Sequence, residues 1–246
     1  MRVAGVDGCR AGWLVAIGEV DGNGEVGRPH LEVLPTFREI LDLPADRVAI
    51  DIPIGLLDTF SPGGRECDRE ARKLLGPIRG TSVFSAPVRP VLRAPPWPAA
   101  MPAGVGLTLQ GWAITGKIRE VDDAMHPGMQ DGGGLLPTVY ETHPEVVFCD
   151  LNDGQAVLLP KRRRPGREER RALIERAFKS SWPDLAAPPG SKVDDLLDAL
   201  ACLWVAAAPD RLLRSLPVIP ETPPRDSKGL RMEIWRRGSV QSRPED

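Results

Sequence analysis

Residues 5–17 read G-V-D-G-C-R-A-G-W-L-V-A-I, and this stretch is the most informative part of the sequence about the fold. Apolar residues on both sides of C-R-A-G predict two strands, over residues 2–7 and 13–20. The first strand ends at Asp7. A carboxylate next to an apolar strand is costly to bury unless it is paired, hydrogen-bonded or bound to a metal ion. Asp7 is therefore the first candidate for a functional residue.

The remaining elements predict an α/β protein. Further strands are expected at 30–34, 47–52 and 138–141, and helices at 36–41, 65–75, 110–125, 166–179 and 193–208. The order β-β-β-α-β indicates a mixed sheet. Residues 76–137 are rich in Pro and Gly and are predicted to be a loop-rich insertion or lid within one domain, residues 1–216. The C-terminal tail, 217–246, is predicted to carry one strand near 230–235.

Composition excludes several classes of protein. The chain has 246 residues, of which 41% are hydrophobic and 27% charged, so a globular core is expected. The net charge of −2 argues against a basic nucleic-acid coat protein. The sequence predicts no membrane span and no signal peptide. Four dispersed cysteines without a C-x-x-C pair predict a reduced, cytoplasmic protein.

More aspartates occur where apolar elements should bury them. Asp51 lies in A-I-D-I-P, and Asp195 and Asp198 are three residues apart on the helix predicted at 193–208. If the strands ending near Asp7 and Asp51 are parallel neighbours, both side chains meet at one sheet edge. Clustered carboxylates repel each other, and hard divalent cations relieve that repulsion. Taken singly, each aspartate also fits a turn, a cap or helix-dipole matching.

These residues carry a resemblance to a known superfamily. The stretch 5–17 resembles the first hairpin of the RNase H-like fold, and in particular that of RuvC-type Holliday-junction resolvases. D-D-L-L-D-A-L-A, residues 194–201, is similar to their final-helix D-x-x-D pattern and matches it at Asp195 and Asp198. A-I-D-I-P places Asp51 at the next carboxylate of that pattern. The resemblance implies a mixed five-stranded sheet flanked by helices.

A second resemblance covers residues 3–235. The chain resembles a bacterial and archaeal family described as predicted RNase H-like nucleases. The matching stretches are V-D-G-C-R-A-G-W, A-I-D-I-P-I-G-L, R-E-C-D-R-E-A-R, T-S-V-F-S-A-P, Y-E-T-H-P-E-V-V-F, D-D-L-L-D-A-L and D-S-K-G-L-R-M-E-I. That family's nuclease label is itself inferred from fold, so the resemblance implies the fold more firmly than the activity.

Other residues of these stretches are candidates for supporting roles. Glu141 and His143 would point the same way on a strand, so Glu141 could join the acidic cluster and His143 could shuttle a proton. His143 fits a capping role equally well. The candidate substrate-binding residues are Arg10, Arg79, Ser82, Ser85 and Arg89, most of them around a polar loop suited to a phosphate. The basic run 161–171 could contact a nucleic-acid backbone or be a solvated helix face.

The leading hypothesis is a nuclease that hydrolyses phosphodiester bonds with two metal ions, Mg²⁺ or Mn²⁺. Its expected metal ligands are Asp7, Asp51, Asp195 and Asp198, supported by Glu141. One alternative is a non-catalytic RNase H-fold binding protein. A weaker one is an ATP-binding protein of the actin and sugar-kinase type, which D-G-G-G at 131–134 supports faintly. Nucleic acid is the expected partner, and resolvase-like relatives suggest a homodimer by analogy.

Overall fold

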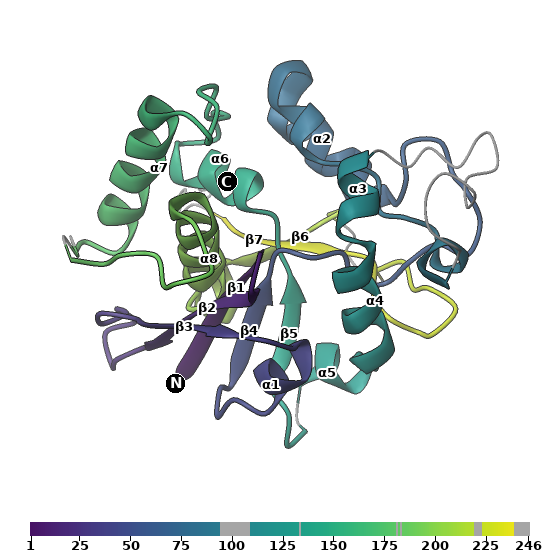
Figure 1. The fold of residues 1–246 in the computed structure, drawn as a ribbon, viewed down its shortest axis with the longest axis horizontal. Helices are drawn as coiled ribbons and strands as arrows, with labels where there is room; N and C mark the ends of the chain where they lie inside the picture. Colours follow the sequence, from purple (N-terminus) through teal and green to yellow (C-terminus); the bar gives the residue numbers. More distant parts are fainter. Residues whose placement is uncertain (94–108, 133, 181, 183, 219–222, 239–246) are drawn as a thin grey trace, which may run out of the picture.

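The computed structural model describes residues 1–93, 109–132, 134–180, 182, 184–218 and 223–238. At its centre is a five-stranded sheet with the strand order β3-β2-β1-β4-β5 (Figure 1). The strands are β1 (Arg2–Cys9), β2 (Gly12–Glu19), β3 (His30–Leu34), β4 (Arg47–Ile50) and β5 (Thr138–Glu141). β1 pairs antiparallel with β2 and parallel with β4, which pairs parallel with β5. The predicted mixed five-stranded sheet is confirmed.

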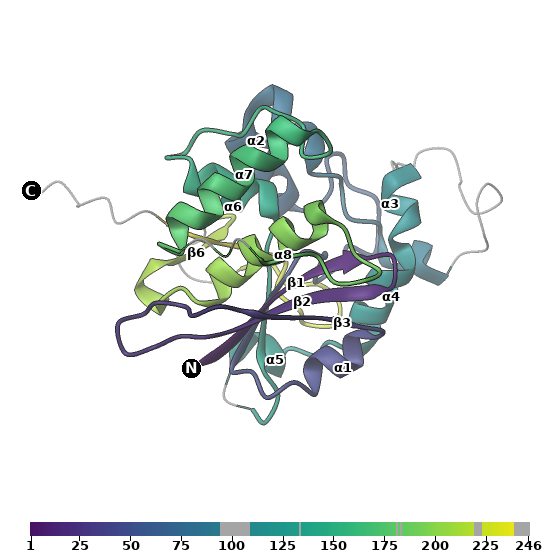
Figure 2. The ribbon, with the colours of Figure 1, turned by 60° about the vertical axis from the view of Figure 1, so that its left-hand side comes forward.

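Helices cover both faces of this sheet (Figures 1 and 2). One face packs against α6 (Pro144–Leu151), α7 (Arg164–Ala177) and α8 (Val193–Ala206), and the other against α1 (Phe37–Leu41), α4 (Thr115–Ala124) and α5 (Gly128–Asp131). Successive strand residues supply opposite faces, so Val3 joins the first core and Ala4 the second. The remaining helices are α2 (Glu66–Arg79), α3 (Leu109–Ala113) and the short 3₁₀ turns Gly80–Ser82, Arg89–Arg93 and Asp210–Leu212.

Two glycines allow the backbone to pass where a side chain would not fit. At Gly5 in β1, a Cβ atom would lie 2.1 Å from the backbone nitrogen of Leu203 in α8. β1 and α8 can therefore approach each other more closely there than side chains permit. Gly12 closes the β1–β2 turn with φ of 144°, and a Cβ would lie 2.2 Å from the carbonyl oxygen of Leu34.

Some elements differ from the sequence-based expectation. The helix α6 was not predicted, because the apolar run of residues 144–151 has no helical periodicity. α2 continues to Arg79 across a kink at Gly76 rather than ending near 75. The strand expected at 230–235 is β7 (Ile234–Arg237), which pairs with β6 (Leu213–Leu216) in a second, two-stranded sheet.

The predicted insertion contributes to the core. Ile118 and Val121 of α4 are fully buried against the sheet. Residues 94–108 of the insertion and 239–246 of the tail lie outside the described residues. Among the helices described, none combines the length and the apolar character needed to cross a membrane.

Candidate functional site

Three aspartates meet where β1, β4 and α8 come together. Asp7 lies near the end of β1 and Asp51 directly follows β4, and the backbone N–H of Asp51 donates a hydrogen bond to the carbonyl oxygen of Val6 at 3.0 Å. Because β1 and β4 are parallel neighbours, both aspartates lie at the same sheet edge. The contact between α8 and β1 places Asp198 beside them, and only 2% of Asp198 is exposed.

The pKa values show that this cluster is electrostatically unfavourable when ionised. Burial raises the pKa of Asp7 well above its usual value, and Asp198 and Asp51 raise it further. Burial likewise raises the pKa of Asp51 and of Asp198 to about 6. Burial also raises the pKa of Asp195, one helical turn earlier in α8. Together these carboxylates form a site that favours an added cation.

A lysine side chain supplies part of that positive charge. Lys161, in the loop before α7, donates a hydrogen bond from Nζ to Oδ2 of Asp198. The negative charge of Asp198 holds the pKa of Lys161 above its usual range, and Asp51 and Asp7 add to the effect. The other carboxylate oxygen of Asp198, Oδ1, is buried and has no hydrogen-bond partner among the described residues. This oxygen is therefore left as a ligand atom for a cation.

Asp7 and Asp51 open into a pocket of about 740 Å³ with mixed charge. Its acidic lining residues are Asp7, Asp51, Asp194 and Asp195, and its basic ones are Lys117, Lys161, Arg162, Arg167 and Lys192. Three of these cations belong to the basic run 161–171, so part of that run faces the site. Sequence reasoning missed Lys161 as a site residue, because nothing in a basic run marks one member as the partner of a distant aspartate.

The clustered carboxylates have the donor atoms, but not the ready geometry, of a divalent metal site. Across the described ranges, no group of three or more His, Cys, Asp or Glu side chains forms a ready metal site. The donor chemistry nevertheless suits Mg²⁺ or Mn²⁺, which prefer carboxylate oxygens and use one or two carboxylates with water and phosphate. The unpartnered Oδ1 of Asp198 is an available ligand atom. Asp7, Asp51 and Asp198 therefore fit such an ion chemically.

Glu141 does not join the aspartates, contrary to the prediction. Its carboxylate binds the guanidinium of Arg65 through contacts of 2.6 and 2.7 Å, and it accepts a hydrogen bond from the backbone N–H of Ile54. Arg65 is 2% exposed and also pairs with Asp68. A buried guanidinium needs carboxylate partners, and Glu141 meets that need. Glu141 therefore anchors the loop after β4 rather than supporting a metal ion directly.

His143 is the N-cap of α6. Its Nδ1 accepts a hydrogen bond from the backbone N–H of Glu145 at 3.2 Å. Burial lowers the pKa of His143, so the imidazole is neutral near pH 7. His143 lines a second pocket, of about 300 Å³, together with Asp51. The structure gives His143 the capping role, and its role as a proton shuttle stays a prediction.

Of the five candidate substrate-binding residues, two line the second pocket and three line neither pocket. Arg79 and Ser82 line the second pocket. Arg10 is exposed in the β1–β2 turn and lines neither pocket. Ser85 accepts a hydrogen bond from the guanidinium of Arg72 at 2.9 Å.

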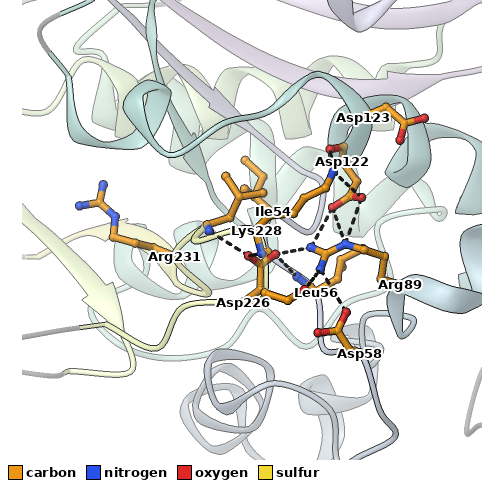
Figure 3. Close-up of polar contacts among 12 residues, drawn as sticks. Ile54, Leu56, Asp58, Arg89, Asp122, Asp123, Asp226, Lys228 and Arg231 are labelled. Carbon is orange, nitrogen blue, oxygen red and sulfur yellow. Dashed lines mark hydrogen bonds and ion pairs between the residues drawn. The ribbon is translucent and has the colours of Figure 1, made fainter.

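Arg89 takes part in a structural ion-pair network, and its role in substrate binding stays a prediction. It pairs with Asp58, Asp122 and Asp226, and lies among them in Figure 3. A guanidinium with three carboxylate partners has little capacity left for a ligand. Sequence patterns do not indicate this network, because Asp226 is 137 residues away from Arg89.

Comparison with known proteins assigns the chain to a family. The chain matches the family described as "Protein of unknown function (DUF429)" over residues 5–222, and it belongs to that family. A comparison with curated proteins found no match. Among solved structures, Thermus thermophilus RuvC is similar with a TM-score of 0.34 and 15% identity, covering 84% of this chain and 95% of that chain.

A second structure, T. thermophilus RuvC in complex with Holliday junction substrate, gives a TM-score of 0.34 and 16% identity, with 83% and 91% coverage.

Proposed function

We propose that this protein is a metal-dependent phosphodiesterase that acts on nucleic acid. The observation that carries the proposal is the cluster of Asp7, Asp51 and Asp198, whose mutual repulsion and burial favour a bound cation. The pocket around it is rimmed by cations that suit a phosphate backbone. The sequence resemblance to RNase H-like nucleases supports the same class of substrate.

Each residue would have a distinct task. Asp7, Asp51 and Asp198 would hold Mg²⁺ or Mn²⁺, with Asp195 orienting water beside them. A metal ion bound there supplies activated water and stabilises the leaving oxygen in phosphodiester hydrolysis. Lys117, Arg162 and Arg167 would bind and orient the phosphate backbone in the pocket. Hydrolysis adds the water oxygen to phosphorus and breaks one P–O ester bond, giving a phosphomonoester and an alcohol.

Lys161 offers a sharp test of the metal site, because it competes with any metal ion for Asp198. We expect Lys161→Met to strengthen Mn²⁺ binding by about threefold or more, since it removes that competitor. Asp51→Asn should weaken binding by about tenfold or more, since it removes a ligand. The control is Arg167→Met, which removes a cation from the same pocket without disturbing an aspartate.

Calorimetric titration with Mn²⁺ measures the affinity of the wild type and of these three variants. Opposite shifts in Lys161→Met and Asp51→Asn, with little change in Arg167→Met, would support the metal centre. No binding in any of them up to roughly 20 mM metal would favour the non-catalytic alternative. A nuclease screen with Mn²⁺ then tests activity, and equal cleavage by the wild type and Asp198→Asn would contradict the proposal.

A further inference from the structure

The second pocket and the acidic pocket form one cleft with two compartments. The two pockets share Asp51, Phe84, Lys161 and Arg162 in their linings, so they adjoin each other. We call the pocket around Asp7 the acidic compartment. The basic compartment is the adjoining pocket of about 300 Å³, whose own lining residues include Arg79, Thr81, Ser82, His143 and Glu145.

The basic compartment has more cationic than anionic side chains in its lining, namely Arg79, Lys161 and Arg162 against Asp51 and Glu145. Glu145 is paired with two arginines, with Arg79 at 2.8 Å and with Arg170 at 2.8 Å. Burial raises the pKa of Glu145, but the two arginines outweigh burial and hold the pKa below its usual value. One ionised carboxylate therefore neutralises only one of two guanidinium groups, and Arg162 adds an exposed cation at the entrance.

One donor group in this compartment lacks an acceptor. The Nε–H group of Arg79 is buried and has no hydrogen-bond partner within the described residues. The hydroxyl of Ser82, half-buried at the end of the 3₁₀ turn Gly80–Ser82, lines the same compartment and can donate a hydrogen bond there. A buried unpaired donor costs free energy, which an oxyanion or an ordered water recovers. Cations and donors with few acceptors match the chemistry of a phosphate group.

We propose that the basic compartment binds a second phosphate of the substrate, adjacent to the phosphodiester that is hydrolysed at the acidic compartment. This inference rests on the proposed function for the hydrolysed bond, but the phosphate site itself does not need metal. A site for two consecutive phosphates selects an oligonucleotide over a small diester with one phosphate. Ser82 and Arg162 are the specificity-determining residues at this site.

Phosphate binding can be measured on metal-free protein in EDTA. Thermal shift and calorimetry with inorganic phosphate and with a 5′-phosphorylated oligothymidylate should both detect binding to the wild type. Ser82→Asp places a negative charge in the compartment and should weaken both ligands by about tenfold or more. Ser82→Asn introduces a side chain of the same shape as Asp but without its charge. Its affinity for both ligands should stay within about threefold of that of the wild type.

Two further variants locate the bound phosphate. Arg162→Gln should also weaken phosphate binding, whereas Arg119→Gln, at an exposed residue that lines neither compartment, should leave inorganic phosphate binding unchanged. Equal phosphate affinity in the wild type and Ser82→Asp, or no binding to the wild type, would overturn the proposal. Tight oligonucleotide binding without inorganic phosphate binding would place the anion elsewhere and would overturn it too.

The hydrolysis assay then addresses the substrate class. With Mn²⁺ present, Ser82→Asp should lose cleavage of the oligothymidylate but keep hydrolysis of bis(p-nitrophenyl) phosphate, which has a single phosphate. Equal losses on both substrates would contradict the second-phosphate site. If neither substrate is hydrolysed but phosphate binding depends on Ser82, the proposed activity fails and the binding site stands.

Discussion

Asp51 is the most accessible of the three clustered aspartates, and its charge is the easiest to remove without breaking another contact. Asp198 is tied to Lys161, and Asp7 lies within a paired strand. The carboxylate of Asp51 has no hydrogen-bond partner among the described residues, and it is only partly buried. Its effect on stability is therefore mainly electrostatic.

We predict that Asp51→Asn stabilises the metal-free protein at high pH. The pKa of Asp51 is about 6 in the folded state, against about 3.9 in the unfolded chain, so folding favours the protonated form. Stability is therefore lost as the pH rises through 6, and the neutral variant escapes that loss. The expected gain in the free energy of unfolding is about 1 to 3 kcal/mol at pH 8, shrinking toward zero near pH 4.

Thermal unfolding in EDTA between pH 4 and pH 8 measures this difference. Asp184→Asn, at an exposed position outside the cleft, is the control and should change the melting temperature little at any pH. A constant difference between Asp51→Asn and wild type across this range would show that Asp51 does not titrate with the predicted pKa.

At the scale of elements, the contact between β1 and α8 sets the distance between Asp7 and Asp198. Gly5 lies at the closest point, where an added Cβ would meet backbone atoms of Leu203 at 2.1 Å and Ala199 at 2.2 Å. Backbone atoms cannot rotate away as side chains do. We predict that Gly5→Ala lowers the free energy of unfolding by about 3 kcal/mol, because α8 must move off the sheet.

Urea denaturation measures this effect, and Gly27→Ala is a matched control. A Cβ at Gly27 meets nothing within 4 Å, so the same change in composition should cost little there. Similar midpoints for Gly5→Ala and wild type would mean that the helix adjusts its position freely. That result would weaken the argument that the β1–α8 contact fixes the aspartate cluster.

The same elements show which parts of the fold were accessible from the sequence. The strands β1, β2 and β4 and the helix α8 have apolar patterns strong enough to predict. The parallel pairing of β1 and β4, which the sequence analysis posed only as a condition, is present in the structure. α6 was missed because V-V-F within residues 144–151 also suits a strand. Two local features favour a helix there: Pro144 lies in the first turn and His143 caps the N-terminus.

The site was predictable only where burial of a carboxylate gave a signal. Asp7, Asp51 and Asp198 stood out as acids in apolar elements, and the structure brings them together. The cation that pairs with each buried carboxylate was not predictable. Burial requires that the carboxylate has a partner, but the amino-acid sequence does not indicate which cation that is. Glu141 pairs with Arg65, 76 residues away, and Asp198 with Lys161.

At the scale of the whole molecule, one ion-pair network joins segments distant in sequence (Figure 3). Asp226, in the C-terminal segment, has a fully buried side chain and pairs with Arg89. It also accepts hydrogen bonds from the backbone N–H groups of Leu56 at 3.0 Å and Leu230 at 2.9 Å. Arg89 extends the network to Asp122 in α4. The C-terminal segment thereby holds the loop that follows Asp51.

We therefore predict that Asp226→Ala destabilises the entire chain rather than releasing the C-terminal segment alone. Removing this carboxylate leaves Arg89 without one partner and leaves buried N–H groups unpaired, at an expected cost of about 3 to 5 kcal/mol. Asp58→Ala is the control, since Asp58 contacts the same arginine at 3.2 Å but is 52% exposed, and its loss should cost about 1 kcal/mol or less. Urea denaturation followed by tryptophan fluorescence should show one cooperative transition at a lower midpoint for Asp226→Ala. The prediction would be contradicted if Asp226→Ala kept the wild-type midpoint while proteases removed its residues 223–246. The loop after β4 would then be held without the C-terminal segment.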